Sequence, residues 1–228
     1  MTFLTTRLPV LMTLALPVVL AAQTLSLNSL EGLSAHKVIA ELGSHQGRIA
    51  VHVTDEGEFL GSNEDKLVVI DEIQFRDGVI ELSVSGAPRS DAGQDARGFV
   101  GIAFRVAADA SSFEAFYLRP TNGRANDQLR RNHSAQYISY PDYPWHRLRD
   151  ETPGLYESYV DLVPGEWTDV RIEIAGSEAR LFVHDAEQPS LIVNDLKLGA
   201  DRSGAIGLWI GPGTDAYFAD LTVTHRSE

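Results

Sequence analysis

The sequence predicts an all-β fold, a two-sheet antiparallel β-sandwich (jelly roll) with a long loop insertion. About ten short segments alternate apolar and polar residues, which places every second side chain on one face of a sheet. Turn signals such as Asp77-Gly78 separate these segments. No stretch has the apolar spacing of a convincing amphipathic helix. Together these features are typical of a sandwich built from many short strands.

The candidate strands occupy most of the chain. The clearest is residues 98–106, where Val100, Ile102 and Phe104 alternate with Gly101 and other outward-facing residues. In residues 170–174 apolar side chains alternate with charged ones, and in residues 206–210 they alternate with Gly207 and Trp209. The expected strands are residues 48–53, 67–70, 79–84, 98–106, 113–119, 170–174, 179–184, 191–193, 206–210 and 221–223.

The two segments 98–106 and 113–119 are expected to pair as antiparallel neighbours. We expect Arg105 opposite Ala115, which buries Phe116 and Leu118 and leaves Arg105, Tyr117 and Arg119 on the outer face. A one-residue slip would place Glu114 opposite Arg105 and bury Tyr117 instead, because a shift of register exchanges the two faces of a strand.

Composition excludes several classes of protein. The chain has 228 residues, a net charge of -13, 43% hydrophobic residues and no cysteine. The apolar fraction is too high for a disordered chain, and the acidic balance argues against a nucleic-acid partner. Without cysteine there are no disulfides, thiolate metal sites or cysteine nucleophiles.

The N-terminus predicts export. Arg7 is followed by an apolar run of about 15 residues that ends in Leu20-Ala21-Ala22. This run is shorter than the roughly 20 residues of a membrane span, and it ends in small residues of the kind that signal peptidase cuts. We expect a signal peptide at residues 1–22, a single β-sandwich domain at residues 23–228 and a periplasmic or secreted location. No cysteine follows the run, so a bacterial lipoprotein is excluded; a buried N-terminal helix is the alternative.

Residues 120–164 interrupt the strand pattern. Six of the chain's 19 basic residues fall within residues 119–149, against only two acids, and five of its seven tyrosines fall within residues 137–159. A long segment of this kind in a compact domain is usually functional.

This mixture of side chains suits a saccharide. Arginine offers planar sets of donors for carboxylates and hydroxyls, and aromatic rings can stack on a sugar ring. The expected ligand-binding residues are Arg105, Arg119, Arg131, Tyr137, Tyr143, Trp145 and Arg147, in one cleft on the concave face. The alternative is that the arginines pair with the protein's own acids and the rings hold the loop in place.

Two residues of the same region are candidates for catalysis. His133 has an imidazole that can act as a general base near neutral pH. Glu157 and Asp161 lie four residues apart, which in a strand would place two carboxylates on one face, as glycoside hydrolysis requires two. No metal site is expected, although turn aspartates such as Asp185 and Asp215 leave calcium as an alternative.

Four segments resemble strands of concanavalin A-like lectin/glucanase domains. They are Gly98-Phe-Val-Gly-Ile-Ala-Phe-Arg105, Phe113-Glu-Ala-Phe-Tyr-Leu-Arg-Pro120, Trp167-Thr-Asp-Val-Arg-Ile172 and Gly204-Ala-Ile-Gly-Leu-Trp-Ile-Gly211. The sequence is most similar to the branches of bacterial secreted 3-keto-disaccharide hydrolase-type and laminin G-like domains. The resemblance implies two curved sheets with a glycan-binding concave face. The Glu-x-Asp-x-x-Glu motif of the superfamily's endoglucanases is absent.

Three functions remain open at this point. The first is an exported glycan-binding protein whose partner is a saccharide or polysaccharide, possibly an acidic one. The second is a carbohydrate-active enzyme, a glycoside hydrolase or lyase that uses the same cleft. The third is a structural or partner-binding surface protein. The oligomeric state does not follow from the sequence.

Overall fold

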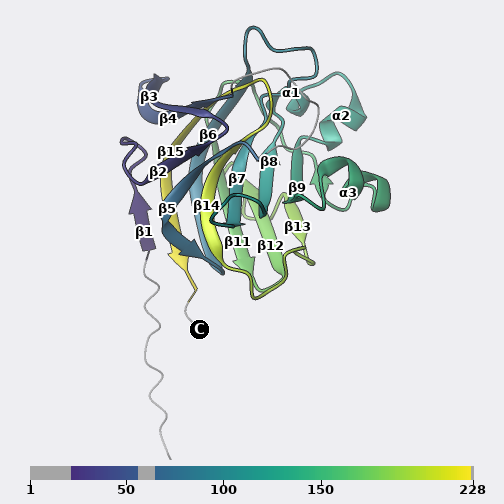
Figure 1. The fold of residues 1–228 in the computed structure, drawn as a ribbon. Coiled ribbons are helices and arrows are strands. Elements are labelled where there is room, and N and C mark those ends of the chain that lie inside the picture. Colours follow the sequence, from purple (N-terminus) through teal and green to yellow (C-terminus); the bar gives the residue numbers. More distant parts are fainter. Residues whose placement is uncertain (1–21, 56–64, 227–228) are drawn as a thin grey trace, which may run out of the picture.

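Two antiparallel sheets form a sandwich in the computed structural model, which describes residues 22–55 and 65–226 (Figure 1). The predicted signal peptide therefore lies, except for Ala22, outside the described residues. Sheet A has the strand order β13 (Leu191–Val193), β12 (Glu178–Val183), β11 (Thr168–Ala175), β6 (Gly78–Pro88), β15 (Thr214–His225), β4 (Arg48–Thr54) and β3 (Ile39–His45), with β1 (Ala22–Leu25) paired to β15. Sheet B has the order β10 (Glu157–Ser158), β9 (Ala135–Tyr140), β8 (Phe113–Leu118), β7 (Val100–Val106), β14 (Gly204–Ile210), β5 (Leu67–Phe75) and β2 (Leu33–His36). The predicted all-β sandwich is confirmed.

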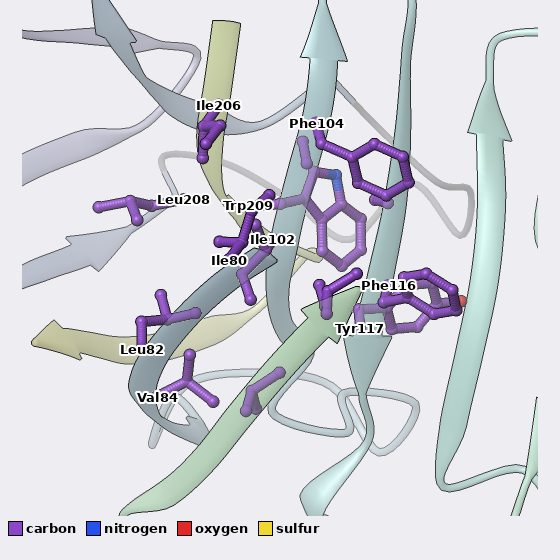
Figure 2. Close-up of a cluster of buried hydrophobic side chains, with 14 of the residues drawn as sticks. Ile80, Leu82, Val84, Ile102, Phe104, Phe116, Tyr117, Ile206, Leu208 and Trp209 are labelled. Atoms are coloured by element: carbon purple, nitrogen blue, oxygen red, sulfur yellow. The ribbon is translucent and has the colours of Figure 1, made fainter. Parts of the chain in front are cut away.

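The hydrophobic core lies between the two sheets. Ile80, Leu82 and Val84 extend from β6 toward Ile102 and Leu208 of sheet B (Figure 2). All five side chains are buried and recur at every second position of their strands. The alternation in the sequence therefore marks the face of each strand that packs inside the sandwich.

The inserted segment is more ordered than the sequence indicates. It contains three short helices, α1 (Pro120–Gly123), α2 (Gln128–Asn132) and α3 (Trp145–Glu151), and also strands β9 and β10. The helices gather on one side of the molecule, near β8 and β9 (Figure 1). Strand β9 lacks apolar alternation because both of its faces are buried, so that polar Gln136 and Ser139 are as enclosed as Ile138.

The pairing of β7 with β8 corrects the expected register. Ala103, and not Arg105, lies opposite Ala115, so the expected pairing is wrong by two residues. An even offset keeps each residue on its predicted face, and Phe116 and Leu118 are buried beside Ile102 and Val100.

Arg105 leaves the outer face because β7 is irregular at this point. Opposite β14, Ala103 pairs with Gly207 and Val106 pairs with Ala205, so two residues of β7 face one residue of its partner. Arg105 adopts a positive φ of 54° there. A bulge of this kind redirects a side chain, and the guanidinium of Arg105 is fully buried.

Candidate functional site

One row of residues crosses the outer face of sheet B. Residues directly opposite each other in neighbouring strands share a face. The register places Trp209 opposite Gly101, Gly101 opposite Tyr117, Tyr117 opposite Gln136, and Gln136 opposite Glu157. Two aromatic rings and a carboxylate, far apart in the sequence, therefore lie in line across four strand junctions.

A glycine allows the two rings of this row to meet. The ring centroids of Tyr117 and Trp209 are 4.7 Å apart, on either side of Gly101. A Cβ atom added to Gly101 would lie 2.3 Å from the carbonyl oxygen of Phe116. The absence of a side chain at residue 101 thus permits the close approach, and Trp209 and Leu208 extend from β14 in different directions (Figure 2).

The rings form the floor of a cavity of about 360 Å³. Phe99 directly precedes β7 and Arg119 directly follows β8, each two residues from Gly101 or Tyr117, and both line the cavity. The walls come from the helices of the insertion and from the loops around residues 95 and 211. The cavity is lined by Asp95, Arg97, Phe99, Tyr117, Arg119, Asn122, Arg130, His133, Trp145, Arg149, Trp209, Gly211 and Pro212.

Helix α3 presents Trp145 and Arg149 to the cavity. They lie four residues apart, hence on one face of the helix, and the guanidinium carbon of Arg149 is 4.6 Å from the ring centroid of Trp145. Arg147 and Glu151 form a second such pair, 2.8 Å apart from Nε to Oε1. Because each helical residue turns the chain by about 100°, Arg147 points roughly away from the cavity.

Glu157 connects the cavity wall to sheet B. Its side chain is only 2% exposed, and the guanidinium of Arg149 donates to both carboxylate oxygens, with Nε 2.9 Å from Oε2. Arg119 Nη1 lies 3.5 Å from Oε1, and His133 Nε2 lies 3.5 Å from Oε2. The structure therefore brings together His133 and Glu157, the two residues that the sequence predicted as catalytic.

The remaining contacts of Arg119 hold it rigidly under the cavity. Its guanidinium donates to the carbonyl oxygen of His133 at 2.9 Å, to the hydroxyl of Tyr117 at 2.7 Å and to Oε1 of Gln136 at 3.2 Å. Burial lowers the pKa of Arg119, while Tyr117 and Glu157 favour the charged form. An arginine remains a cation at neutral pH under these conditions.

Burial also lowers the pKa of His133 below its ordinary value of 6.5. Glu157 acts in the opposite direction, and the cations Arg149 and Arg119 lower the pKa further. The imidazole is therefore neutral at neutral pH and has a lone pair that can accept a proton.

The cavity is positively charged, although the protein as a whole is acidic. Four arginines line it, against the single carboxylate of Asp95, with Glu157 behind the wall. In residues 22–55 and 65–226, no carboxylate lies within ion-pair distance of Arg130, whose Nη2 donates to Oδ1 of Asn122 at 3.4 Å. Positive neighbours lower the pKa of Arg97, after burial, which reflects mutual repulsion of these cations. Such a cluster suits an anionic group.

A second hollow, of about 540 Å³, adjoins the same wall. It shares His133 and Arg149 with the cavity, and Glu157 also lines it. Its outer part includes the exposed side chains of Leu129 and Tyr159. We refer to the two depressions as the inner cavity and the outer hollow.

Two of the predicted ligand-binding residues lie in the interior instead. Arg105 is fully buried and donates to Glu114, to Asp77 and to backbone carbonyls of Gly176 and Gly199. Tyr137 is also fully buried and donates to Oε1 of Glu114 at 2.7 Å. Neither lines the inner cavity or the outer hollow. Their ion pairs and hydrogen bonds hold the sandwich together.

Three more of the predicted residues lie outside the inner cavity. Arg147 and Tyr143 stack on each other, with the guanidinium carbon 4.3 Å from the ring centroid. Arg131 stacks on Tyr159 at 4.9 Å and donates to its hydroxyl at 2.7 Å. Of the predicted ligand-binding set, Arg119 and Trp145 line the inner cavity.

Sequence reasoning missed most of the floor of the cavity. Trp209 and Tyr117 both occupy outward positions of alternating strands, and a large aromatic side chain on an outward position was a usable signal. Arg97 and Arg130 were recognisable as basic residues, but no sequence pattern placed them beside Trp209. Asp161 pairs with the exposed Arg124 at 2.8 Å, so it does not join Glu157 as the spacing suggested.

Among the described residues, no group of three or more histidine, aspartate or glutamate side chains could hold a metal ion. Of the aspartates considered for calcium, Asp215 lies within strand β15 and not in a turn. Asp195 accepts hydrogen bonds from Lys197 and Tyr156, and Asp215 pairs with His52.

Comparisons with known proteins place the chain by fold. No protein-family model and no curated protein matches the sequence. The carbohydrate-binding module CBM66 from Bacillus subtilis is similar over 84% of this chain and 95% of the module, with a TM-score of 0.54 and 11% identity. A Bacillus subtilis protein of unknown function with a galectin-like fold is similar over 90% of this chain and 96% of its own, with a TM-score of 0.55 and 11% identity.

A transglycosylase is also similar in fold at low sequence identity. Crh5, solved in complex with NAG, covers 90% of this chain and 84% of its own, with a TM-score of 0.51 and 12% identity. The fold is a lectin-like jelly roll. At these identities the similarity concerns the fold alone.

Proposed function

We propose that this protein binds a saccharide in the inner cavity, and that the saccharide carries an acidic group. The observation that carries the proposal is the composition of this cavity: four arginines stand over a floor of aromatic rings on the outer face of sheet B. The volume of about 360 Å³ lies at the lower end of the roughly 300–1,000 Å³ typical of small-molecule sites.

Each part of the cavity matches a part of such a ligand. Trp145 offers apolar ring surface against which the C–H face of a sugar can pack, and the buried rings of Trp209 and Tyr117 close the floor of the cavity. The guanidinium of Arg130 has no carboxylate partner among the described residues, so it is available to a carboxylate or sulfate. His133 adds a hydrogen-bonding group for sugar hydroxyls.

The structural neighbours support this proposal through their own descriptions. CBM66 is described as a carbohydrate-binding module, and the Crh5 structure contains NAG. Membership of the concanavalin A-like superfamily agrees with the fold, and we propose it for this chain. The closer relation to 3-keto-disaccharide hydrolase-type and laminin G-like domains stays a prediction.

A glycan array tests the proposal. Residues 23–228 are applied to immobilised neutral, carboxylated and sulfated glycans, and hits are quantified by calorimetry. Preferential binding of acidic glycans is the expected result. Binding of neutral glycans alone would remove the acidic group from the proposal, and no binding to any glycan would favour the third function, a structural or partner-binding protein.

The pair His133–Glu157 favours an enzyme as the second candidate. On a uronic-acid chain, the neutral imidazole of His133 would take the C5 proton while an arginine neutralises the carboxylate. The electron pair would form a C4–C5 double bond, and the C4 oxygen would leave with a proton from the site or solvent. The site is less suited to glycoside hydrolysis by two carboxylates, because Asp161 forms an ion pair with Arg124 and does not lie beside Glu157.

Elimination leaves an unsaturated product that absorbs ultraviolet light, so turnover of uronides can be followed directly. Turnover that disappears in His133→Gln would establish the second candidate. Binding of the same uronides without turnover would leave the binding protein.

We also propose that the protein is exported after removal of residues 1–22. The apolar run after Arg7 and the site at Ala22 support export. No helix in the described part of the chain is long and apolar enough to cross a membrane. Mass spectrometry of the periplasmic or secreted protein should show an N-terminus at or near Gln23, and recovery of the intact chain from the cytoplasm would contradict export.

A further inference from the structure

The outer hollow has the features of a second binding position. Its lining combines polar groups of Asn132, Glu157 and Ser158 with the exposed ring of Tyr159. We propose that the protein binds a chain of sugar units, with one unit in the inner cavity and the next in the outer hollow. This inference rests on the proposed function, because it assigns the length of the ligand for the same site.

The wall between the two depressions supports a shared ligand. His133 and Arg149 line both the inner cavity and the outer hollow. One face of this wall therefore contacts a group in the cavity, and the other contacts a group in the hollow. A glycosidic linkage that passes over His133 and Arg149 would connect the two.

The rigid setting of the wall also supports this inference. Arg149 is held by the buried Glu157 through two hydrogen bonds and stacks on Trp145 at 4.6 Å. A guanidinium fixed in this way loses little conformational freedom when a ligand binds. The wall thus presents the same donors to both positions.

Tyr159 provides the stacking surface of the outer hollow. Its side chain is 42% exposed, and Arg131 restrains the ring through stacking at 4.9 Å and a hydrogen bond to the hydroxyl at 2.7 Å. Tyr159 lines the hollow and Arg131 does not, so the restrained ring contributes the surface. This arrangement gives Arg131 a positioning role, in place of the direct contact that the sequence predicted.

The boundary of the hollow matches a sugar rather than a protein partner. Its lining mixes polar side chains with the ring of Tyr159 and with two small apolar surfaces, those of Leu129 and Pro153. Sugar units combine polar edges with one apolar face, and they suit a site of this mixed character.

Ligand length provides the test. Calorimetry compares a mono-uronide with a tetra-uronide on the wild-type residues 23–228 and on three variants. Tyr159→Ala removes the stacking surface, Asn132→Trp fills the hollow from the exposed end of α2, and Leu155→Ala is the control. Leu155 is an exposed apolar residue, 52% accessible, that lines neither depression.

The tetra-uronide should bind the wild type more tightly than the mono-uronide. Tyr159→Ala and Asn132→Trp should weaken binding of the tetra-uronide by about tenfold, and they should leave the mono-uronide and the thermal stability unchanged. Leu155→Ala should change neither ligand. Tyr159→Phe should retain affinity for the tetra-uronide, because it keeps the ring.

Two results would overturn the inference while the proposed function survives. One is equal affinity of the wild type for both lengths with no effect of Tyr159→Ala. The other is an equal loss for both lengths in Asn132→Trp. Failure of the wild type to bind either uronide, by contrast, would overturn the proposed acidic ligand and this inference together.

Discussion

Nε2 of His133 lies 3.5 Å from Oε2 of Glu157, across the wall that separates the inner cavity from the outer hollow. His133 ends helix α2, and Glu157 begins the edge strand β10. Arg119 and Arg149 pair with the same carboxylate, and burial together with these two cations lowers the pKa of His133. This relationship makes the wall sensitive to charge, and five predictions concern the wall and the cavity around it.

Arg130→Ala should weaken binding of an acidic glycan. The side chain is exposed and has no carboxylate partner among the described residues, so its loss should leave stability unchanged. A charge-assisted contact contributes about 1.5–3 kcal/mol, which corresponds to a roughly ten- to hundredfold loss of affinity. Calorimetry with the best acidic glycan from the array measures this loss.

Arg147→Ala is the matched control for this experiment. It removes the same charge from the same segment, but Arg147 pairs with Glu151 and lines neither depression. Its affinity should equal that of the wild type. Equal losses in the two variants would indicate a general field effect and would contradict a specific contact of Arg130.

Affinity for an acidic glycan should rise as the pH falls below the ordinary histidine pKa of 6.5. Burial and the neighbouring arginines lower the pKa of His133, so it gains its proton only at acidic pH. The added positive charge then attracts the ligand. Calorimetry across this pH range on the wild type and on His133→Gln tests whether His133 causes the pH dependence of affinity. If the same pH dependence persists in the variant, His133 is not its cause.

The same shift has a consequence for stability. The pKa of His133 is lower in the folded state than the value of 6.5 in the unfolded state, so the unfolded state binds a proton more readily. The resulting contribution to stability is complete above pH 6.5 and is lost as the pH falls through the folded-state pKa. His133→Gln should therefore be less sensitive to acid than the wild type. Urea titrations at neutral and mildly acidic pH measure the difference.

Arg119→Met should destabilise the protein by about 3 kcal/mol. The change removes the donor to Oε1 of Gln136, leaves the carbonyl oxygen of His133 with Asn122 as its remaining side-chain donor, and removes one cation from the buried Glu157. Urea unfolding measures the loss. Arg124→Met is the control, because its pair with Asp161 is at the surface, and little change is expected there. Comparable midpoints for both variants would refute a structural role of Arg119.

Gly101→Val should destabilise the protein by about 1–3 kcal/mol and disturb the floor of the cavity. The added side chain would collide with the backbone of Phe116 and with Tyr117, whose ring packs on Trp209. Thermal unfolding and tryptophan fluorescence report the two effects. Gly93→Ala is the control, because a Cβ atom there meets nothing within 4 Å. A fluorescence spectrum unchanged by Gly101→Val would contradict the proposed packing.

The sequence by itself determined the sandwich and the faces of its strands. Alternation in residues such as Ile206, Leu208 and Ile210 reflects a local geometric fact, since a strand turns successive side chains to opposite faces. The buried face of a strand can therefore be predicted without knowing which strands pair with it. It also placed Tyr117 and Arg119 on the outer face correctly, even though the expected register was shifted by two residues.

Only the tertiary structure decided which residues share the cavity. Trp209, Tyr117 and Glu157 meet because the register aligns strands that are distant in the sequence, and register depends on pairing between strands and not on the pattern within one. Because Trp145 and Arg147 lie two residues apart in helix α3, their side chains point in different directions and only Trp145 lines the inner cavity. The bulge in β7 turns Arg105 into the interior. The composition of a segment reports which side chains are available, whereas the direction in which each one points is set by backbone geometry that forms only when the sheets and helices pack.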